Sequence, residues 1–270
     1  MPEHNHLGCR LHYRLSGGGP PILMIQGVGV HGDGWQPQVE YLLSNCQCLT
    51  FDNRGLGLSQ PVGENFSLKQ FADDALSLMD AAGWQSAHVI GHSMGGLISQ
   101  HLALTAPHRV RSLSLLCTFS RGKDVTALTW EMTVYGIRTR LGPAAWRRQA
   151  FLEMITAPGS IAQPEQDALI ARMTKLFGHD LAHQPPIVMK QLSAMSDYDA
   201  TPRLGELSGI PTLVVSGAYD RIARPALGRA LAAAIPHSSY TEFEDAGHAL
   251  PITHASRLNP LLLNHISETS

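Results

Sequence analysis

Three residues that lie far apart in the chain have the chemistry of a nucleophile, a base and an orienting acid. Ser93 lies at the centre of the G-H-S-M-G sequence of residues 91–95, a G-x-S-x-G pattern that holds a serine in a sharp turn. A serine hydroxyl needs a histidine to take its proton, and that histidine needs a carboxylate to fix its tautomer. Asp220 and then His248 follow Ser93 in the order that this motif requires. The pattern therefore predicts covalent acyl transfer at Ser93, with His248 as base and Asp220 as acid.

Each of these assignments has an alternative. The G-x-S-x-G residues could form only a tight strand-to-helix turn, and Asp220 could merely cap the helix that follows it. Asp124 is a rival acid, whereas His31 and His254 are rival bases. We favour Ser93, Asp220 and His248 because each directly follows its own predicted strand.

Acyl transfer also needs donors for the oxyanion of the tetrahedral intermediate, and these are usually two backbone N–H groups. Met94 is one candidate, since it opens the helix after the nucleophile and adds the positive end of that helix. The second donor should come from the glycine-rich loop of residues 26–32, in which Val28 is the best candidate. The alternative for this loop is a flexible glycine turn. His92 is expected to pack against the core rather than take part in the chemistry.

Strands that alternate with helices position these residues. The predicted strands span residues 9–15, 21–25, 46–51, 87–90, 110–117, 210–217 and 238–243, and the predicted core helices span 35–43, 67–82, 97–104, 225–234 and a segment after 254. This alternation predicts an α/β fold with a mostly parallel sheet and helices on both faces. Sites in such sheets lie at the carboxyl ends of the strands, where Ser93 is predicted to lie.

The strand signal disappears between residues 120 and 202, where Trp, Met, Leu and Ala dominate and Gly-Pro or Pro-Pro pairs interrupt the pattern. This segment is predicted to form a helical cap of four or five helices over Ser93. The domains are therefore an α/β core of residues 1–119 and 203–270 and a cap of residues 120–202. Apolar cap residues could line a substrate pocket or form the core of the cap itself. The four candidates for pocket lining are Trp130, Tyr135, Trp146 and Met154.

Composition and charge exclude several classes of function. With 270 residues, 44% hydrophobic content and 16% charged content, the chain is long enough for one large domain with an insertion. Its formal net charge of −2 offers no attraction to nucleic acid or to an anionic membrane. No segment resembles a signal peptide or a membrane helix, so a cytoplasmic location is expected. Four arginines of the cap are interpreted as a solvated helix face rather than an anion site: Arg138, Arg140, Arg147 and Arg148.

The cysteines and histidines do not suggest a disulfide framework or a metal site. Cys46 and Cys48 are too close together to brace the fold, and Cys9 and Cys117 fall in or beside strands, so reduced thiols are expected. The fourteen histidines show no ligand spacing typical of a metal site, although the pair at positions 4 and 6 could bind a metal adventitiously. We therefore expect no metal and no cofactor.

Several motifs resemble those of the α/β-hydrolase family, and the resemblance covers nearly the whole chain. Residues 11–21 resemble the opening hairpin of the family, and residues 52–59 resemble its D-x-R-G-x-G-x-S loop. Residues 211–220 resemble its P-T-L-V-x-x-G-x-x-D segment, and residues 247–248 complete the set. One departure concerns residues 26–27, which are Gln-Gly where the family usually has His-Gly. The side chain that braces the oxyanion loop is therefore expected to differ.

The resemblance implies an α/β-hydrolase fold and a small cofactor-free enzyme. Serine at position 93 argues against haloalkane dehalogenases and epoxide hydrolases, whose nucleophile is an aspartate. Carboxylesterases, methyl esterases, enol-lactonases and cofactor-free haloperoxidases remain. We expect a serine hydrolase, monomeric or homodimeric, that cleaves a small or medium carboxylic ester, thioester or lactone, free or carrier-bound, through an acyl-enzyme. The alternatives are hydrolysis of carbon–carbon bonds in ring-cleavage diketones and a non-catalytic small-molecule receptor.

Overall fold

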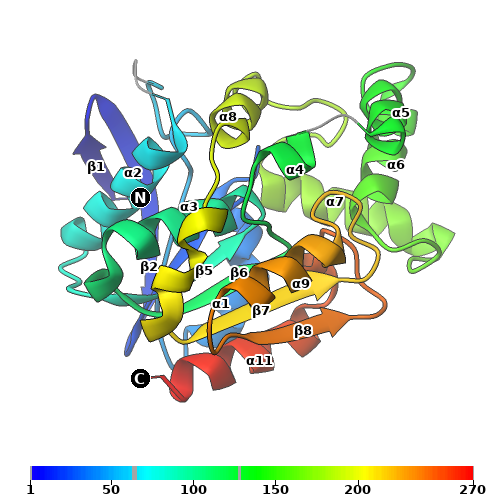
Figure 1. Ribbon diagram of the computed structural model, residues 1–270. Helices are drawn as coiled ribbons and strands as arrows, with labels where there is room; N and C mark the ends of the chain where they lie inside the picture. Colours follow the sequence, from blue (N-terminus) through cyan, green and yellow to red (C-terminus); the bar gives the residue numbers. More distant parts are fainter. Residues whose placement is uncertain (1, 63–65, 127–128, 270) are drawn as a thin grey trace.

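The sheet at the centre of the molecule confirms the predicted α/β architecture. The structure is a computed structural model and describes residues 2–62, 66–126 and 129–269. Eight strands pair in the order β1-β2-β4-β3-β5-β6-β7-β8 (Figure 1). Their bounds are β1 Glu3–His6, β2 Cys9–Gly17, β3 Pro21–Ile25, β4 Gln47–Phe51, β5 Ala87–His92, β6 Val110–Leu116, β7 Thr212–Gly217 and β8 Ser239–Phe243. The pairs β1–β2 and β2–β4 are antiparallel, and the other five pairs are parallel.

Alternate residues of the central strands supply two separate hydrophobic cores, because successive side chains of a strand point to opposite faces. On one face, Leu23, Val89 and Val214 pack against α2 (Leu68–Ala81), α3 (Met94–Thr105) and α9 (Pro225–Ala234). On the other face, Met24 and Ile90 pack against α1 (Gln36–Leu42) and α11 (Ala255–Ser267). Figure 1 shows these helices on both sides of the sheet. Every residue of β5 and β7 is buried, as expected for parallel strands that are covered on both faces.

The register of the parallel strands brings the predicted site residues to one edge of the sheet. His92 pairs with Leu116 across β5 and β6, and Leu116 pairs with Val215 across β6 and β7. The residues that follow these strands therefore emerge side by side, with Ser93 after β5 and Asp220 shortly after β7.

The cap segment, defined as residues 120–202, lies between β6 and β7 in the chain. It contains α4 (Lys123–Thr126), α5 (Trp130–Arg138), α6 (Ala144–Ile155), α7 (Gln163–Phe177), α8 (Ile187–Ser196) and the start of η3 (Thr201–Gly209). In Figure 1, α5 and α6 lie beyond the tips of β7 and β8. A third hydrophobic cluster joins Leu152, Met173 and Phe177 of this segment to Val30 and Ile252 of the sheet domain. The cap segment is thus packed onto the edge of the sheet where Ser93 lies.

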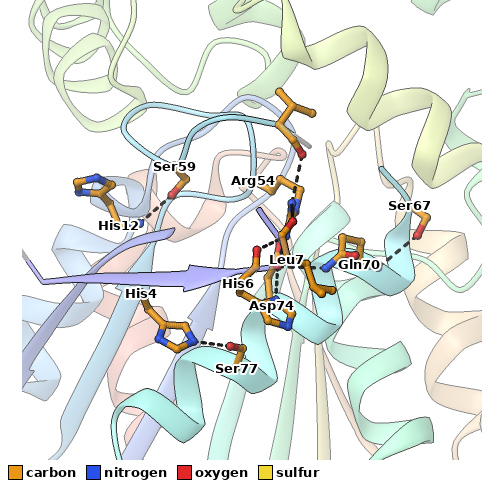
Figure 2. Close-up of polar contacts among 11 residues, drawn as sticks. His4, His6, Leu7, His12, Arg54, Ser59, Ser67, Gln70, Asp74 and Ser77 are labelled. Carbon is orange, nitrogen blue, oxygen red and sulfur yellow. Dashed lines mark hydrogen bonds and ion pairs between the residues drawn. The ribbon is translucent and has the colours of Figure 1, made fainter. Parts of the chain in front are cut away.

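A buried ion pair fixes the loop that follows β4 and bears the D-x-R-G-x-G-x-S pattern (Figure 2). Arg54 donates from Nε and Nη2 to the Asp74 carboxylate of α2 at 2.9 and 2.6 Å, and both side chains are only 1% exposed. Its remaining N–H groups reach the carbonyl oxygens of His6, Leu7 and Val62. Such a pair is tolerated inside a protein only when further hydrogen bonds satisfy both groups. Arg54 therefore joins the β1–β2 hairpin, the loop and α2.

The terminal strand β1 was not predicted, because its polar side chains resemble a disordered end. Its histidines instead bind the adjoining helix: His4 Nε2 lies 2.6 Å from Ser77 Oγ, and His6 Nδ1 lies 2.8 Å from the Asp74 carboxylate (Figure 2). These two histidines, which were considered as an adventitious metal site, thus have structural partners. All four cysteines are buried and unpaired.

Candidate active site

The predicted nucleophile occupies a strained turn between β5 and α3. Ser93 has φ 56° and ψ −121°, a conformation that side chains other than glycine seldom adopt. Glycines make this turn possible because a Cβ at Gly91 would collide with the carbonyl of Gly95, and one at Gly95 would collide with Ile25. The turn is also held by the neighbouring strand, since Ser93 N–H donates to the Leu116 carbonyl at 3.0 Å. Strain of this kind, about 1–3 kcal/mol, persists where the surroundings impose it.

A residue that the sequence did not single out supports the same turn. Thr118 Oγ1 donates a 2.7 Å hydrogen bond to the Ser93 carbonyl, and its side chain occupies the space that a Cβ on Gly96 would need. Thr118 is only 1% exposed. The next residue, Met94, is fully buried and begins α3, so its N–H lies at the positive end of that helix.

The predicted base and acid are hydrogen-bonded to each other. His248 Nδ1 donates to Asp220 Oδ2 at 2.8 Å, and the two residues are 8% and 3% exposed. The other carboxylate oxygen, Oδ1, accepts the backbone N–H groups of Ile222 and Ala223 at 2.9 and 2.8 Å. Asp220 therefore caps the following turn and is hydrogen-bonded to His248 at the same time, so the two interpretations of this residue are compatible. With the proton on Nδ1, His248 Nε2 is left to accept a proton.

His92 holds the backbone of the predicted base. Its Nε2 lies 3.0 Å from the His248 carbonyl oxygen. Burial, together with the nearby His248 side chain, lowers the pKa of His92 to about 3, so the ring is neutral and donates from Nε2. Ligand-type atoms of His92, Cys117 and His248 lie within 4.8 Å of one another, a spacing that could hold a metal ion. Burial raises the pKa of the Cys117 thiol well above its usual range, which opposes the thiolate that metal binding requires.

The rival residues are engaged elsewhere. Asp124 accepts hydrogen bonds from its neighbour Arg121, and His254 lies 3.5 Å from a carboxylate oxygen of Asp245. His31 lies 3.7 Å from a carboxylate oxygen of the loop after β4. Ser93 and His248, in contrast, line the same cavity.

The predicted oxyanion loop runs directly beside the nucleophile. A Cβ built on Gly27 would lie 2.9 Å from Ser93 Cβ and 3.4 Å from its Oγ, so only glycine allows this approach. Gln26, the residue that departs from the family pattern, is 3% exposed and accepts the Gly27 N–H through Oε1 at 3.3 Å. Its amide nitrogen fills the space beside Gly34, where an added Cβ would lie 2.6 Å from it. Val28 lines the cavity next to this pair.

The cap segment holds the same loop from the other side. Gln191 of α8, which is fully buried, accepts the Gly29 N–H through Oε1 at 2.8 Å. His179 Nε2 lies 3.0 Å from the Gly29 carbonyl oxygen. Gly29 has φ +71°, and an added Cβ would lie 2.9 Å from Val188. The cap segment and the predicted oxyanion loop are therefore one hydrogen-bonded unit, a connection that the sequence did not reveal.

A cavity of about 1280 Å³ lies between the sheet edge and the cap segment. Of the four cap residues proposed from the sequence, Met154 lines this cavity, whereas Trp130, Tyr135 and Trp146 are outside the lining that the described residues form. Trp130 and Trp146 are 83% and 70% exposed because they lie on the outer faces of α5 and α6. Tyr135 instead packs beside Arg221, whose guanidinium lies 5.8 Å from the ring centre.

The fold and this arrangement define a class of protein, and comparison with known proteins identifies the family. A family model described as the alpha/beta hydrolase fold matches residues 20–255. The chain therefore belongs to the α/β-hydrolase family and is a hydrolase. Within the described ranges, none of the helices combines the length and the hydropathy needed to cross a bilayer.

Individual relatives with similar sequences or structures are named as a hydrolase, a lactonase and an esterase. The chain is 31% identical over 275 residues to a protein of Azorhizobium caulinodans named "Putative carbamate hydrolase RutD", with 99% of each chain covered. The enol-lactonase from Burkholderia xenovorans LB400 superimposes with a TM-score of 0.82 and 27% identity, covering 98% of this chain and 100% of the other. A thermophilic esterase from Thermogutta terrifontis gives a TM-score of 0.78 and 25% identity, with coverage of 97% and 94%.

Proposed function

We propose that this protein is a serine hydrolase that cleaves a small or medium carboxylic ester, thioester or lactone through an acyl-enzyme at Ser93. The observation that carries the proposal is the 2.8 Å hydrogen bond between His248 and Asp220, in a cavity that Ser93 also lines. This bond fixes the tautomer in which His248 Nε2 can take the proton of the serine hydroxyl.

The proposed reaction has two halves. Ser93 Oγ attacks the acyl carbon while His248 Nε2 takes its proton, and the N–H groups of Val28 and Met94 stabilise the oxyanion. The intermediate collapses when His248 returns the proton to the leaving alcohol or thiol, which leaves the acyl group on Ser93. A water molecule then attacks this ester, again with His248 as base, and releases the acid and the free serine. The same steps open a lactone, except that the leaving alcohol remains attached to the acyl group.

Carbamate hydrolysis is a second candidate, favoured by the 31% identity to the RutD relative over 99% of both chains. A carbamate carbonyl can be attacked by the same nucleophile, and the leaving group is then protonated by the same histidine. The difference lies in the substrate and not in the residues that are proposed to act.

Labelling and turnover test the proposal together. A fluorophosphonate probe should modify Ser93, as read by mass spectrometry, and panels of p-nitrophenyl esters, lactones and aryl carbamates should reveal turnover. Ser93→Ala should abolish both signals, whereas Ser208→Ala, a change at an exposed serine, should leave them intact. Labelling that persists in Ser93→Ala would overturn the assignment of the nucleophile. Binding of these compounds without any turnover would instead favour a receptor on the same fold.

A further inference from the structure

The permanently charged side chains that line the cavity of Ser93 are all positive among the described residues. Its described lining includes two permanently charged side chains, Arg140 and Arg147, and includes neither lysine nor a carboxylate. Most of the remaining lining is apolar, from residues such as Phe151 and Leu192. A substrate in this cavity therefore meets two positive charges and no fixed negative charge from the residues that the structure describes.

The other two arginines of this part of the cap segment are neutralised. Arg138 pairs with Glu153 at 2.8 Å, and Arg148 grips both oxygens of Asp180 at 2.7 and 2.6 Å. Both pairs lie outside the cavity lining. The sequence-based interpretation of four solvated arginines therefore fits Arg138 and Arg148, because their charges are matched on the surface.

Arg140 and Arg147 differ from them, since neither forms an ion pair with a carboxylate of the described residues. Arg147 Nη2 donates to His183 Nε2 at 3.2 Å, but its buried Nε has no hydrogen-bond partner among the described residues. Arg140 donates to the Gly136 carbonyl at 3.1 Å. Each guanidinium carries five N–H donors, so these contacts leave both Arg140 and Arg147 with donors for a ligand.

Helix α6 sets the distance between these charges and the proposed nucleophile. Arg147, Phe151, Met154 and Ile155 all line the cavity, at the i, i+4, i+7 and i+8 spacing of one helix face. The Ile155 carbonyl accepts the backbone N–H of Ala249 at 2.8 Å, so this end of the helix adjoins the loop that bears His248. Eight residues at 1.5 Å each place the backbone of Arg147 about 12 Å away along the helix. The apolar side chains of Phe151, Met154 and Ile155 therefore lie between the end of the cavity near His248 and the end near Arg147.

We propose that the natural substrate carries a carboxylate at the end remote from the scissile bond, and that Arg140 and Arg147 bind it. The proposal rests on the proposed function and names its substrate class. Planar guanidinium groups match a carboxylate with paired hydrogen bonds, and the apolar wall of α6 would contact the intervening carbon chain. The cavity thus fits a long molecule with an ester, thioester or lactone at one end and an anion at the other.

Matched pairs of esters test this specificity. Mono-p-nitrophenyl esters of succinic, adipic and suberic acid would be compared with the same compounds capped as methyl esters, which lack the charge. A second series, ω-acetoxy carboxylates and their methyl esters, places the anion on the alcohol side. In at least one series the wild type should prefer the anion, and the preference should increase with chain length. Arg147→Gln should lower kcat/KM for the anionic ester by about 10- to 100-fold, the range expected for hydrogen bonds to a charged group.

Controls separate this effect from a general change of charge. Arg138→Gln removes the same charge from a paired surface site, and it should leave kcat/KM for both ester forms within about twofold. Arg147→Gln should lower kcat/KM for the anionic ester by a larger factor than for the neutral ester. If a variant does not fold, inhibition of the wild type by suberate can be compared with inhibition by octanediamide, which has the same chain length but neither a charge nor an ester. Only the dianion should compete strongly.

Two results would overturn the proposal. One is equal kcat/KM for anionic and neutral esters in both series, together with no selective inhibition by suberate. The other is an equal loss in Arg138→Gln and Arg147→Gln, which would indicate only a long-range field. Failure of the proposed function looks different, because neither the neutral esters nor the fluorophosphonate probe would then react at Ser93.

Discussion

Replacing Asp220 with asparagine would separate its two structural roles. Oδ1 accepts the N–H groups of Ile222 and Ala223, while Oδ2 accepts the proton of His248 Nδ1. An asparagine can keep its oxygen in the first position and must then place an NH₂ group in the second. That donor faces His248 Nδ1 and forces the ring proton onto Nε2. The proposed base could then no longer take the proton of Ser93.

The magnitudes of the two effects differ. Loss of the correct tautomer should lower kcat by about 10³- to 10⁴-fold, which corresponds to about 4–5.5 kcal/mol of transition-state stabilisation. The free energy of unfolding should change by no more than about 1 kcal/mol, because the capping hydrogen bonds survive. Asp220→Ala should lower kcat to a similar extent but also leave two backbone N–H groups without their acceptor, at about 1–3 kcal/mol each. In a chain of this size, each kcal/mol lowers Tm by about 2–4 °C.

Steady-state kinetics on a p-nitrophenyl ester and thermal unfolding of the same preparations would check both numbers. Asp124→Asn, which changes the rival acid, serves as the matched control and should keep kcat within about twofold. A kcat for Asp220→Asn within tenfold of the wild type would refute the orienting role. Equal Tm values for the asparagine and alanine variants would refute the separate capping role of Asp220 Oδ1.

Three further perturbations test other parts of the structure. Asp74→Asn should lower the free energy of unfolding by about 3–5 kcal/mol because it leaves Arg54 buried without its countercharge, and urea denaturation would measure this; unchanged stability would contradict the ion pair. Gln191→Leu removes the acceptor of the Gly29 N–H, so kcat should fall about tenfold while KM changes little; a change confined to KM would argue against support of the oxyanion loop. Burial lowers the pKa of His88 to about 4, so between pH 6.5 and 4 the unfolded chain binds a proton that the folded chain does not. The titration of His88 should therefore contribute a decrease of about 1–2 kcal/mol in stability from pH 7 to pH 5, and urea denaturation of His88→Gln should show a decrease that is shallower by this amount.

The most predictable features were motifs whose conformation depends on a few neighbouring residues. The glycines around Ser93 and the order of Asp220 and His248 each depend on a few residues next to a strand end, so the sequence alone indicated them. The alternation of strands and helices indicated the parallel sheet for the same reason. The short polar strand Glu3–His6 was not predicted because its side chains show no apolar alternation, although it pairs with β2 and its histidines contact α2.

Contacts between distant parts of the chain were beyond prediction. The hydrogen bond from Gly29 to Gln191 joins residues that are 162 positions apart, and no local pattern marks either partner. The pocket lining was missed for a related reason. Trp130 and Trp146 were chosen as large apolar residues, yet the helices that carry them turn these side chains outward. Hydrophobicity identifies candidates for burial, whereas the packing of one helix on another decides which face is buried.

The sequence does not show which arginines of the cap segment are neutralised by a carboxylate, whereas the ion pairs in the structure do. Both oxygens of Asp180 are held by Arg148, whose guanidinium keeps the pKa of that carboxyl well below its usual range. Asp180 therefore stays ionised and committed to Arg148. His183 lies between Asp180 and Arg147, with Nδ1 3.6 Å from Asp180 Oδ2 and Nε2 3.2 Å from Arg147 Nη2, so it separates Arg147 from that carboxylate. Arg147 thus keeps its full charge at the cavity wall, because the nearby Asp180 carboxylate is already paired with Arg148. The proposed binding of an anionic substrate depends on this unpaired charge.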